Sequence, residues 1–99
     1  MTNIVAELFF WDKVIIQDRY ILEMRIYRLE GTERYPEGVK YGLILFDVLT
    51  RGFVLMDNHY PKGHHVHVND REMAYHYVDQ IKLLADFRRL VLKNMGVRI

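Results

Sequence analysis

The chain has 99 residues, of which 51% are hydrophobic and 27% are charged, and its formal net charge is +1. This length fits one domain and excludes a two-domain enzyme, a complete dinucleotide-binding fold and a TIM barrel. The lack of cysteine excludes disulfide bonds, thiolate catalysis and a cysteine zinc site, and the apolar content is too high for a disordered chain.

The first part of the chain is predicted to form strands. Residues 4–11 and 14–16 are rich in β-branched and aromatic side chains, with a polar break between them. Residues 20–29 alternate between apolar and polar side chains, which is the pattern of a strand with one buried face. The polar residues 32–38, which include a proline and a glycine, are predicted to form an exposed loop.

Two further strands are predicted at residues 41–49 and 53–56, joined by a turn at residues 50–52. Successive strands with short connections pair with each other in antiparallel directions. The chain from residue 4 to residue 57 therefore predicts an antiparallel β-meander of about four to five strands.

The last third of the chain predicts an amphipathic helix over about residues 78–95. Asp79 suits the positive end of the helix dipole, and Gly96 suits a C-terminal cap. Because one helix cannot bury its own apolar face, we expect it to pack on one face of the meander. The prediction is a single α+β domain over residues 1–99. Apolar side chains recur in the helix at steps of three and four, at Ile81, Leu84, Phe87, Val91 and Met95.

Charge and histidine are unevenly distributed along the chain. Residues 1–60 carry a net charge of −2 and residues 61–99 a net charge of +3. Histidine takes up a proton near pH 6.5, so a histidine cluster in the basic part is expected to attract anions. Four histidines lie close together there, at His59, His64, His65 and His67.

The N-terminus has no basic region followed by a long apolar run, and no stretch approaches the ~18 apolar residues of a membrane span. We therefore expect no signal peptide and no membrane partner, and a cytoplasmic location is predicted.

Residues 57–70 are predicted to form a histidine-rich loop before the helix, and this loop is the candidate functional site. If its second half is extended, His65 and His67 point to the same face, about 6.5–7 Å apart. Two imidazoles in this arrangement can share a metal ion, or act as an acid and a base on a phosphate. A third metal ligand would have to come from Asp57, His59 or Glu72.

Lys62 and Gly63 favour an anion over a metal ion. An ammonium group beside a side-chain-free backbone N–H can hold a phosphate. At ~6 Å the same ammonium repels a dication by about 5–6 kcal/mol at an effective dielectric constant of about 20. We therefore expect a metal-independent anion site without a cofactor. With both histidines and one of Tyr60, Tyr75 and Tyr77, it would suit a ribonuclease, although the sequence does not order the roles.

Several of these residues also have structural interpretations. Asp57 and Asn58 are common at the start of a turn, where their side chains bind the backbone. His59 and His64 are interpreted as exposed loop residues. Trp11 is more consistent with a core or partner surface than with a cofactor site.

The motif D-N-x3-K-G-H-H-x-H at residues 57–67 resembles the signature of the TumE-like toxin family of bacterial and archaeal toxin–antitoxin systems. After this motif, Arg71, Glu72 and Tyr75 also match the family, and the similarity extends from about residue 6 to about residue 92. The chain departs from the family pattern, which often has glycine, an acidic residue and proline in place of Arg19, His64 and Ala74.

This resemblance implies a small cytoplasmic toxin whose partner is a helix-turn-helix antitoxin. Our hypothesis is that the toxin acts on RNA through its lysine and histidine loop, without a metal. The expected catalytic residues are Lys62, His65, His67 and Tyr75, and the expected binding residues are Asp57, Asn58, Gly63, Arg71 and Glu72.

Two alternatives stay open, a non-enzymatic protein-binding module and a small metal-binding protein. A homodimer is also an expectation, because an exposed edge strand at residues 4–10 or 53–56 could pair with its copy.

Overall fold

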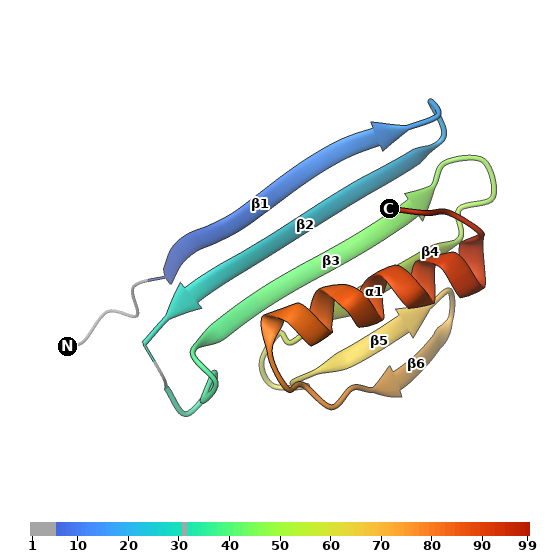
Figure 1. Ribbon diagram of the computed structural model, residues 1–99. Helices are drawn as coiled ribbons and strands as arrows, with labels where there is room; N and C mark the ends of the chain where they lie inside the picture. Colours follow the sequence, from blue (N-terminus) through green and yellow to red (C-terminus); the bar gives the residue numbers. More distant parts are fainter. Residues whose placement is uncertain (1–5, 31) are drawn as a thin grey trace.

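The computed structural model describes residues 6–30 and 32–99, which form a six-stranded antiparallel sheet and one helix (Figure 1). The strands follow one another across the sheet in chain order. This arrangement confirms the predicted α+β meander with a C-terminal helix. The strands are β1 Ala6–Ile16, β2 Tyr20–Leu29, β3 Val39–Asp47, β4 Phe53–Asp57, β5 His65–Val68 and β6 Arg71–Ala74, and the helix is α1 Gln80–Met95.

The sheet has more strands than predicted, because the second half of the expected histidine-rich loop forms β5, and the residues that follow the loop form β6. β5 and β6 have four residues each and pair with each other, with Val68 opposite Arg71. Asn69, in the turn between them, has a φ of 55°, a conformation that asparagine adopts more readily than most residues. β6, Arg-Glu-Met-Ala, lacks apolar alternation, and β5 alternates histidine and valine over only four residues, the shortest run that indicates a strand.

β1 is one continuous strand where two were predicted. Asp12 and Lys13 continue the strand, opposite Met24 and Glu23 of β2. A polar pair does not interrupt β1 because this strand is the edge of the sheet and most of its side chains face solvent. Residues 4 and 5 of the predicted strand lie outside the described residues.

The hydrophobic core lies between α1 and one face of the sheet. In β3, Leu43 and Leu45 are fully buried, while the residues between them are only partly buried. From α1, Leu83, Phe87 and Val91 are equally buried and follow one another at steps of four, the spacing of one helix face. The sequence placed Ile81 on this face, but its side chain is 83% exposed and Leu83 takes the buried position.

α1 begins two residues later than predicted because Asp79 caps it. The Asp79 carboxylate accepts a hydrogen bond from the backbone N–H of Lys82 at 2.7 Å. At the other end Gly96 has a φ of 69°, the left-handed conformation typical of a C-terminal cap, as predicted.

The helix leaves much of the sheet uncovered. It lies over the half of the sheet that contains β4 and β5, and β1 and β2 extend beyond it (Figure 1). The opposite face of the sheet has no helix among the described residues, and we call it the open face. Side chains that alternate with the core residues of β2 to β5 project from this open face.

β1 carries large apolar side chains that the fold does not bury. The strand also contains an irregularity between Leu8 and Phe10, where its register with β2 shifts. The guanidinium of Arg28 lies over the Phe9 ring at 4.4 Å. The exposed apolar residues of this edge are Leu8, Phe9, Phe10, Trp11, Val14 and Ile15.

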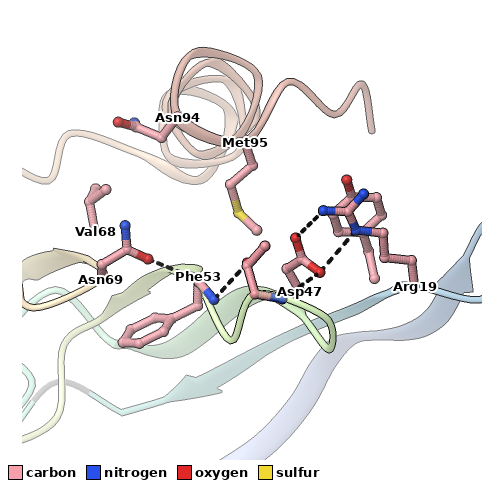
Figure 2. Close-up of a pocket in the computed structure, with 10 residues that line it drawn as sticks. Arg19, Asp47, Phe53, Val68, Asn69, Asn94 and Met95 are labelled. Carbon is pink, nitrogen blue, oxygen red and sulfur yellow. Dashed lines mark hydrogen bonds and ion pairs between the residues drawn. The ribbon is translucent and has the colours of Figure 1, made fainter.

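A pocket lies at the end of the sheet where α1 ends. Its walls include Arg19, at the turn after β1, and Asp47, the last residue of β3. Figure 2 shows these two side chains joined by two hydrogen bonds, with Met95 of α1 above them. Thus the turn from β1 to β2 and the end of β3 are held together beneath the C-terminal end of the helix.

Within the described residues, α1 falls short of the length and apolar character that a membrane-crossing helix needs.

Candidate functional site

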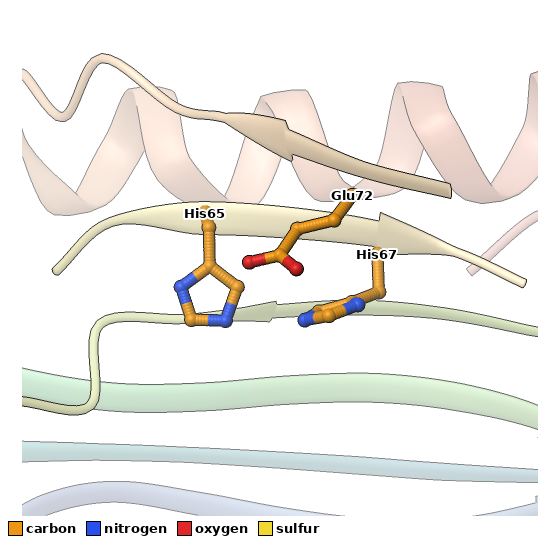
Figure 3. Close-up of side chains that lie close together, drawn as sticks. All are labelled: His65, His67 and Glu72. Carbon is orange, nitrogen blue, oxygen red and sulfur yellow. The ribbon is translucent and has the colours of Figure 1, made fainter. Parts of the chain in front are cut away.

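The open face of β5 presents the two histidines of the H-x-H pair. Val66 and Val68 of this strand belong to the core, and successive side chains of a strand point to opposite faces. His65 and His67 therefore project together from the open face, and their ring centroids are 4.9 Å apart with the rings edge to face. Figure 3 shows both rings with Glu72 beside them.

Glu72 enters this site from β6. It lies directly opposite His67 in the antiparallel pair, so the two side chains share a face. One ligand atom from each of His65, His67 and Glu72 can be chosen so that all three lie within 4.8 Å of one another. We call these three residues, together with Asp57 and Lys62, the His/Glu cluster.

His65 is held by two oxygen atoms. Its Nδ1 lies 2.7 Å from the carbonyl oxygen of Gly63, and its Nε2 lies 3.0 Å from Oδ1 of Asp57. The side chain is only 9% exposed. Both contacts are hydrogen bonds only when each nitrogen carries a hydrogen, since both partners are acceptors. The geometry therefore fixes the ring and pairs it with a carboxylate, which is how a carboxylate orients a histidine in many active sites.

Gly63 contributes its backbone to this arrangement. Its φ is 74°, a left-handed conformation that glycine adopts without steric cost. This turn aims the Gly63 carbonyl at the His65 ring. The glycine of the Lys-Gly pair thus positions a histidine, a role that the sequence did not indicate.

Lys62 and Glu72 form an exposed ion pair at the rim of the cluster. Their charged atoms are 2.6 Å apart, and the side chains are 58% and 40% exposed. The ammonium of Lys62 lowers the pKa of the Glu72 carboxyl, so this group stays ionised at neutral pH. Since an exposed pair contributes little to stability, Lys62 can exchange Glu72 for another anion.

The cluster has the composition of a site for a divalent ion, because two imidazoles and one carboxylate are a common set of zinc ligands. Two of the three ligands are already engaged, His65 by Asp57 and Glu72 by Lys62. An ion would have to displace the Lys62 ammonium from Glu72. The positive charge of Lys62 thus occupies a position that a dication would need.

Asn58 is not part of the exposed cluster. It is 3% exposed, and its amide oxygen accepts from the backbone N–H of Tyr41 at 2.9 Å. Its amide nitrogen donates to the carbonyl oxygen of Val39 at 2.8 Å. Asn58 therefore ties the segment after β4 to the start of β3.

Tyr75 and Arg71 are also placed away from the cluster. The Tyr75 hydroxyl donates to the Asp86 carboxylate of α1 at 2.7 Å, and its ring packs against the core. Burial, followed by this hydrogen bond, raises the pKa of Tyr75, which disfavours a role as a base. Arg71 lies opposite Val68, a core residue, so it belongs to the helix side of the sheet edge.

His64 forms a separate network on the helix side. Its Nδ1 is 2.8 Å from the Tyr41 hydroxyl, and its Nε2 is 3.0 Å from the Glu37 carboxylate. The ring stacks on Tyr77 with centroids 4.9 Å apart. Burial raises the pKa of Tyr41, so its hydroxyl stays protonated at neutral pH. His64 is therefore packed and hydrogen-bonded, and not the merely exposed loop residue that was expected.

The structure has a hollow beside the cluster that the sequence did not predict. It lies on the open face where β2, β3 and the end of β4 meet, and it adjoins the cluster through Asp57. The signal that could have found it is Gly42, a glycine within a predicted apolar strand. We call it the Gly42 hollow, and it is lined by Arg25, Tyr27, Lys40, Tyr41, Gly42, Asp57 and His59.

Comparison with known protein families gives one result. The family described as "Toxin TumE" has a model that matches residues 3–95 of this chain. No curated protein and no solved structure matches this chain.

Proposed function

The chain belongs to the TumE toxin family, and on this premise we propose that it is a toxin that breaks RNA phosphodiester bonds at its His/Glu cluster. The observation that carries the proposal is the grouping of two histidines and a carboxylate on the open face of β5 and β6 with Lys62 from the connection between β4 and β5. These are the groups that general acid–base cleavage of RNA needs. RNA as the target also implies action in the cytoplasm.

Lys62 is the proposed phosphate binder. Its ammonium moves from Glu72 to the substrate phosphate, where it stabilises the negative charge that develops on the phosphorane oxygens. This movement also frees the Glu72 carboxylate next to His67.

Glu72 and His67 are the proposed proton-transfer groups. Glu72 accepts the proton of the ribose 2′-hydroxyl as its oxygen attacks phosphorus, and the bond from phosphorus to the 5′-oxygen breaks. Protonated His67 donates its proton to that 5′-oxygen. The products are a 2′,3′-cyclic phosphate and a free 5′-hydroxyl, and no other reactant is consumed.

His65 is a positioning residue in this scheme. Both of its ring nitrogens are engaged, by Gly63 and by Asp57, and its ring contacts that of His67 edge to face. It therefore limits the orientations open to His67. Tyr75 has no role here because it lies on the helix side of the sheet.

The test compares wild type with Lys62→Met and His67→Ala, and uses His76→Ala as the matched control because His76 is exposed outside the cluster. We expect wild type and the control to cleave RNA and arrest growth. His67→Ala should lose about 10²–10⁴-fold in cleavage rate. DNA of the same sequence should stay intact because it lacks the 2′-hydroxyl. Growth arrest by His67→Ala equal to that of wild type would reject the proposal.

A protein-binding role is favoured by a different observation, the exposed apolar edge of β1. A partner strand that adds to this edge would bury these side chains and pair the free backbone groups. The helix-turn-helix antitoxin expected for a toxin of this family is our proposed partner. Trp11→Ser should then weaken antitoxin binding and leave growth arrest by the toxin alone unchanged. If the toxin acted only by binding and without catalysis, Lys62→Met and His67→Ala would still arrest growth.

A further inference from the structure

The Gly42 hollow and the His/Glu cluster share one row of residues across the sheet. Gly42 lies opposite Arg25 on one side and opposite Asp57 on the other, and Asp57 lies opposite His65. Residues opposite each other in antiparallel strands point to the same face. The open face therefore runs without interruption from the hollow to the cluster.

Glycine at position 42 is not required by the fold. Among residues 6–30 and 32–99, a Cβ atom added there would meet no atom within 4 Å apart from those of the two chain neighbours, and the backbone does not adopt the left-handed conformation. Glycine is also unfavourable in the middle of a strand, because it packs nothing and gains flexibility on unfolding. A strand position that keeps glycine under these conditions often marks the close approach of a ligand to the backbone.

The walls of the hollow carry positive charge and an aromatic ring. Arg25 and Lys40 provide the charge, and the Arg25 side chain is half exposed although it also contacts Glu23 at 2.8 Å. Tyr27 provides the ring. The carboxylate in the hollow, Asp57, faces the His65 imidazole. Two cations around a flat ring and a bare backbone suit one nucleotide, with its phosphate on the cations and its base against the ring.

We propose that the Gly42 hollow binds the nucleotide next to the cleaved phosphate, and that the substrate is single-stranded RNA. This inference rests on the proposed function, since it assigns a substrate position to the same site. Only an unpaired base can turn out of its strand and stack on Tyr27 at the wall of the hollow. Double-stranded RNA would present its backbone alone.

The test measures binding of a short, fluorescein-labelled single-stranded RNA by anisotropy, with the matching duplex as comparison. Gly42→Leu fills the hollow, and Gly42→Ala adds one methyl group to open space. We expect Gly42→Leu to bind about tenfold or more weakly and Gly42→Ala to bind as wild type. Because leucine suits a strand better than glycine, thermal unfolding of Gly42→Leu should occur at or above the wild-type temperature.

Two wall substitutions test the chemistry independently of Gly42. Tyr27→Ala should weaken binding about tenfold, the expected loss of one stacked base. Arg25→Gln should reduce the slope of log affinity against log salt concentration by about 0.7, the value for one phosphate contact to a single strand. These variants carry the test if Gly42→Leu does not fold.

Wild-type RNA binding by folded Gly42→Leu, or by Tyr27→Ala if Gly42→Leu is unfolded, would overturn this inference. Equal affinity for the duplex would overturn it as well. The proposed function fails separately, if His67→Ala cleaves RNA as fast as wild type. Loss of cleavage in His67→Ala with normal cleavage in Gly42→Leu would therefore reject the nucleotide subsite alone.

Discussion

Asp47 accepts hydrogen bonds from Nε and Nη2 of Arg19, at 3.0 and 2.8 Å. Its Oδ1 also accepts from the backbone N–H of Leu49 at 3.0 Å. The carboxylate is buried, whereas 38% of the Arg19 side chain is exposed. One carboxylate thus orders the turn after β3 and fastens it to the turn after β1.

This pair predicts a loss of stability in acid. The hydrogen bonds from Arg19, and then those from the turn backbone, hold the pKa of Asp47 well below its ordinary value. A carboxyl group whose pKa is lowered by folding stabilises the protein above its unfolded pKa, about 3.9, and this stability is lost as pH falls toward the folded value. We expect the unfolding temperature to decrease from about pH 4 downward.

Arg19→Gln isolates the contribution of this pair, because other carboxyl groups, such as Asp86, also have a lowered pKa. The variant should unfold at a lower temperature than wild type near neutral pH, and the difference should shrink in acid. The measurement is circular dichroism during heating at a series of pH values. A difference that stays constant with pH would contradict this account.

Asn58→Ala is predicted to destabilise the protein by about 2–3 kcal/mol, because it removes two hydrogen bonds and leaves buried backbone groups of β3 unpaired. Asn94→Ala is the matched control. Asn94 lies on the exposed side of α1, where its side chain donates to the Leu90 carbonyl oxygen of the same helix. Urea unfolding of both variants checks the prediction, and equal effects would show that Asn58 does not hold the loop.

The N-terminal cap of α1 gives a further prediction. Asp79→Ala should cost about 1 kcal/mol of unfolding free energy, since the N–H of Lys82 loses its acceptor. Asp79→Asn should retain most of the stability because asparagine is an equally good cap. If both substitutions cost the same, the charge of Asp79 and not its capping hydrogen bond would be the important property.

Zinc titration tests the expected metal independence of the His/Glu cluster. We expect wild type to bind Zn²⁺ with a dissociation constant above about 1 μM, because Glu72, one of the three possible ligands, is already paired with Lys62. Lys62→Met should strengthen binding because it removes a positive charge near the ion. Calorimetry would measure both affinities. Submicromolar binding by wild type that is lost in His67→Ala would show instead that the cluster is a metal site.

Periodicity in the sequence was enough to predict β2 and α1, whereas an apolar run at residues 41–49 predicted β3, which spans Val39–Asp47. The alternation of residues 20–29 predicted β2 within its observed bounds, and the apolar steps after residue 78 predicted α1. Both elements are long enough for their period to repeat several times. The shift from Ile81 to Leu83 at the start of the helix shows the limit of this reasoning, because only the sheet determines which side of the first turn is buried.

The site was only partly predictable. Extended backbone alone was enough to predict that His65 and His67 share a face. Tyr75 lies on the helix side of the sheet, opposite the cluster, because β6 ends at the residue before it. No sequence signal indicated this strand. The row that joins Gly42 to His65 depends on the register of three strands, which arises from tertiary pairing.

The charged pair in the middle of β1 has a consequence for self-association. The regular stretch of the strand is residues 10–16. If it paired along its whole length with a second copy in the antiparallel direction, Lys13 would lie opposite Lys13, and the helices of both copies would lie on the same side of the joined sheet. A slip of two residues would place Asp12 opposite Asp12. Like charges directly opposite each other are destabilising. These two registers are thus disfavoured for pairing with a second copy, whereas a slip of two residues in the other direction sets Val14 opposite Val14 and opposes no like charges. The charged pair therefore limits the registers in which this apolar edge can pair with itself, and it places no such limit on a strand of different charge pattern.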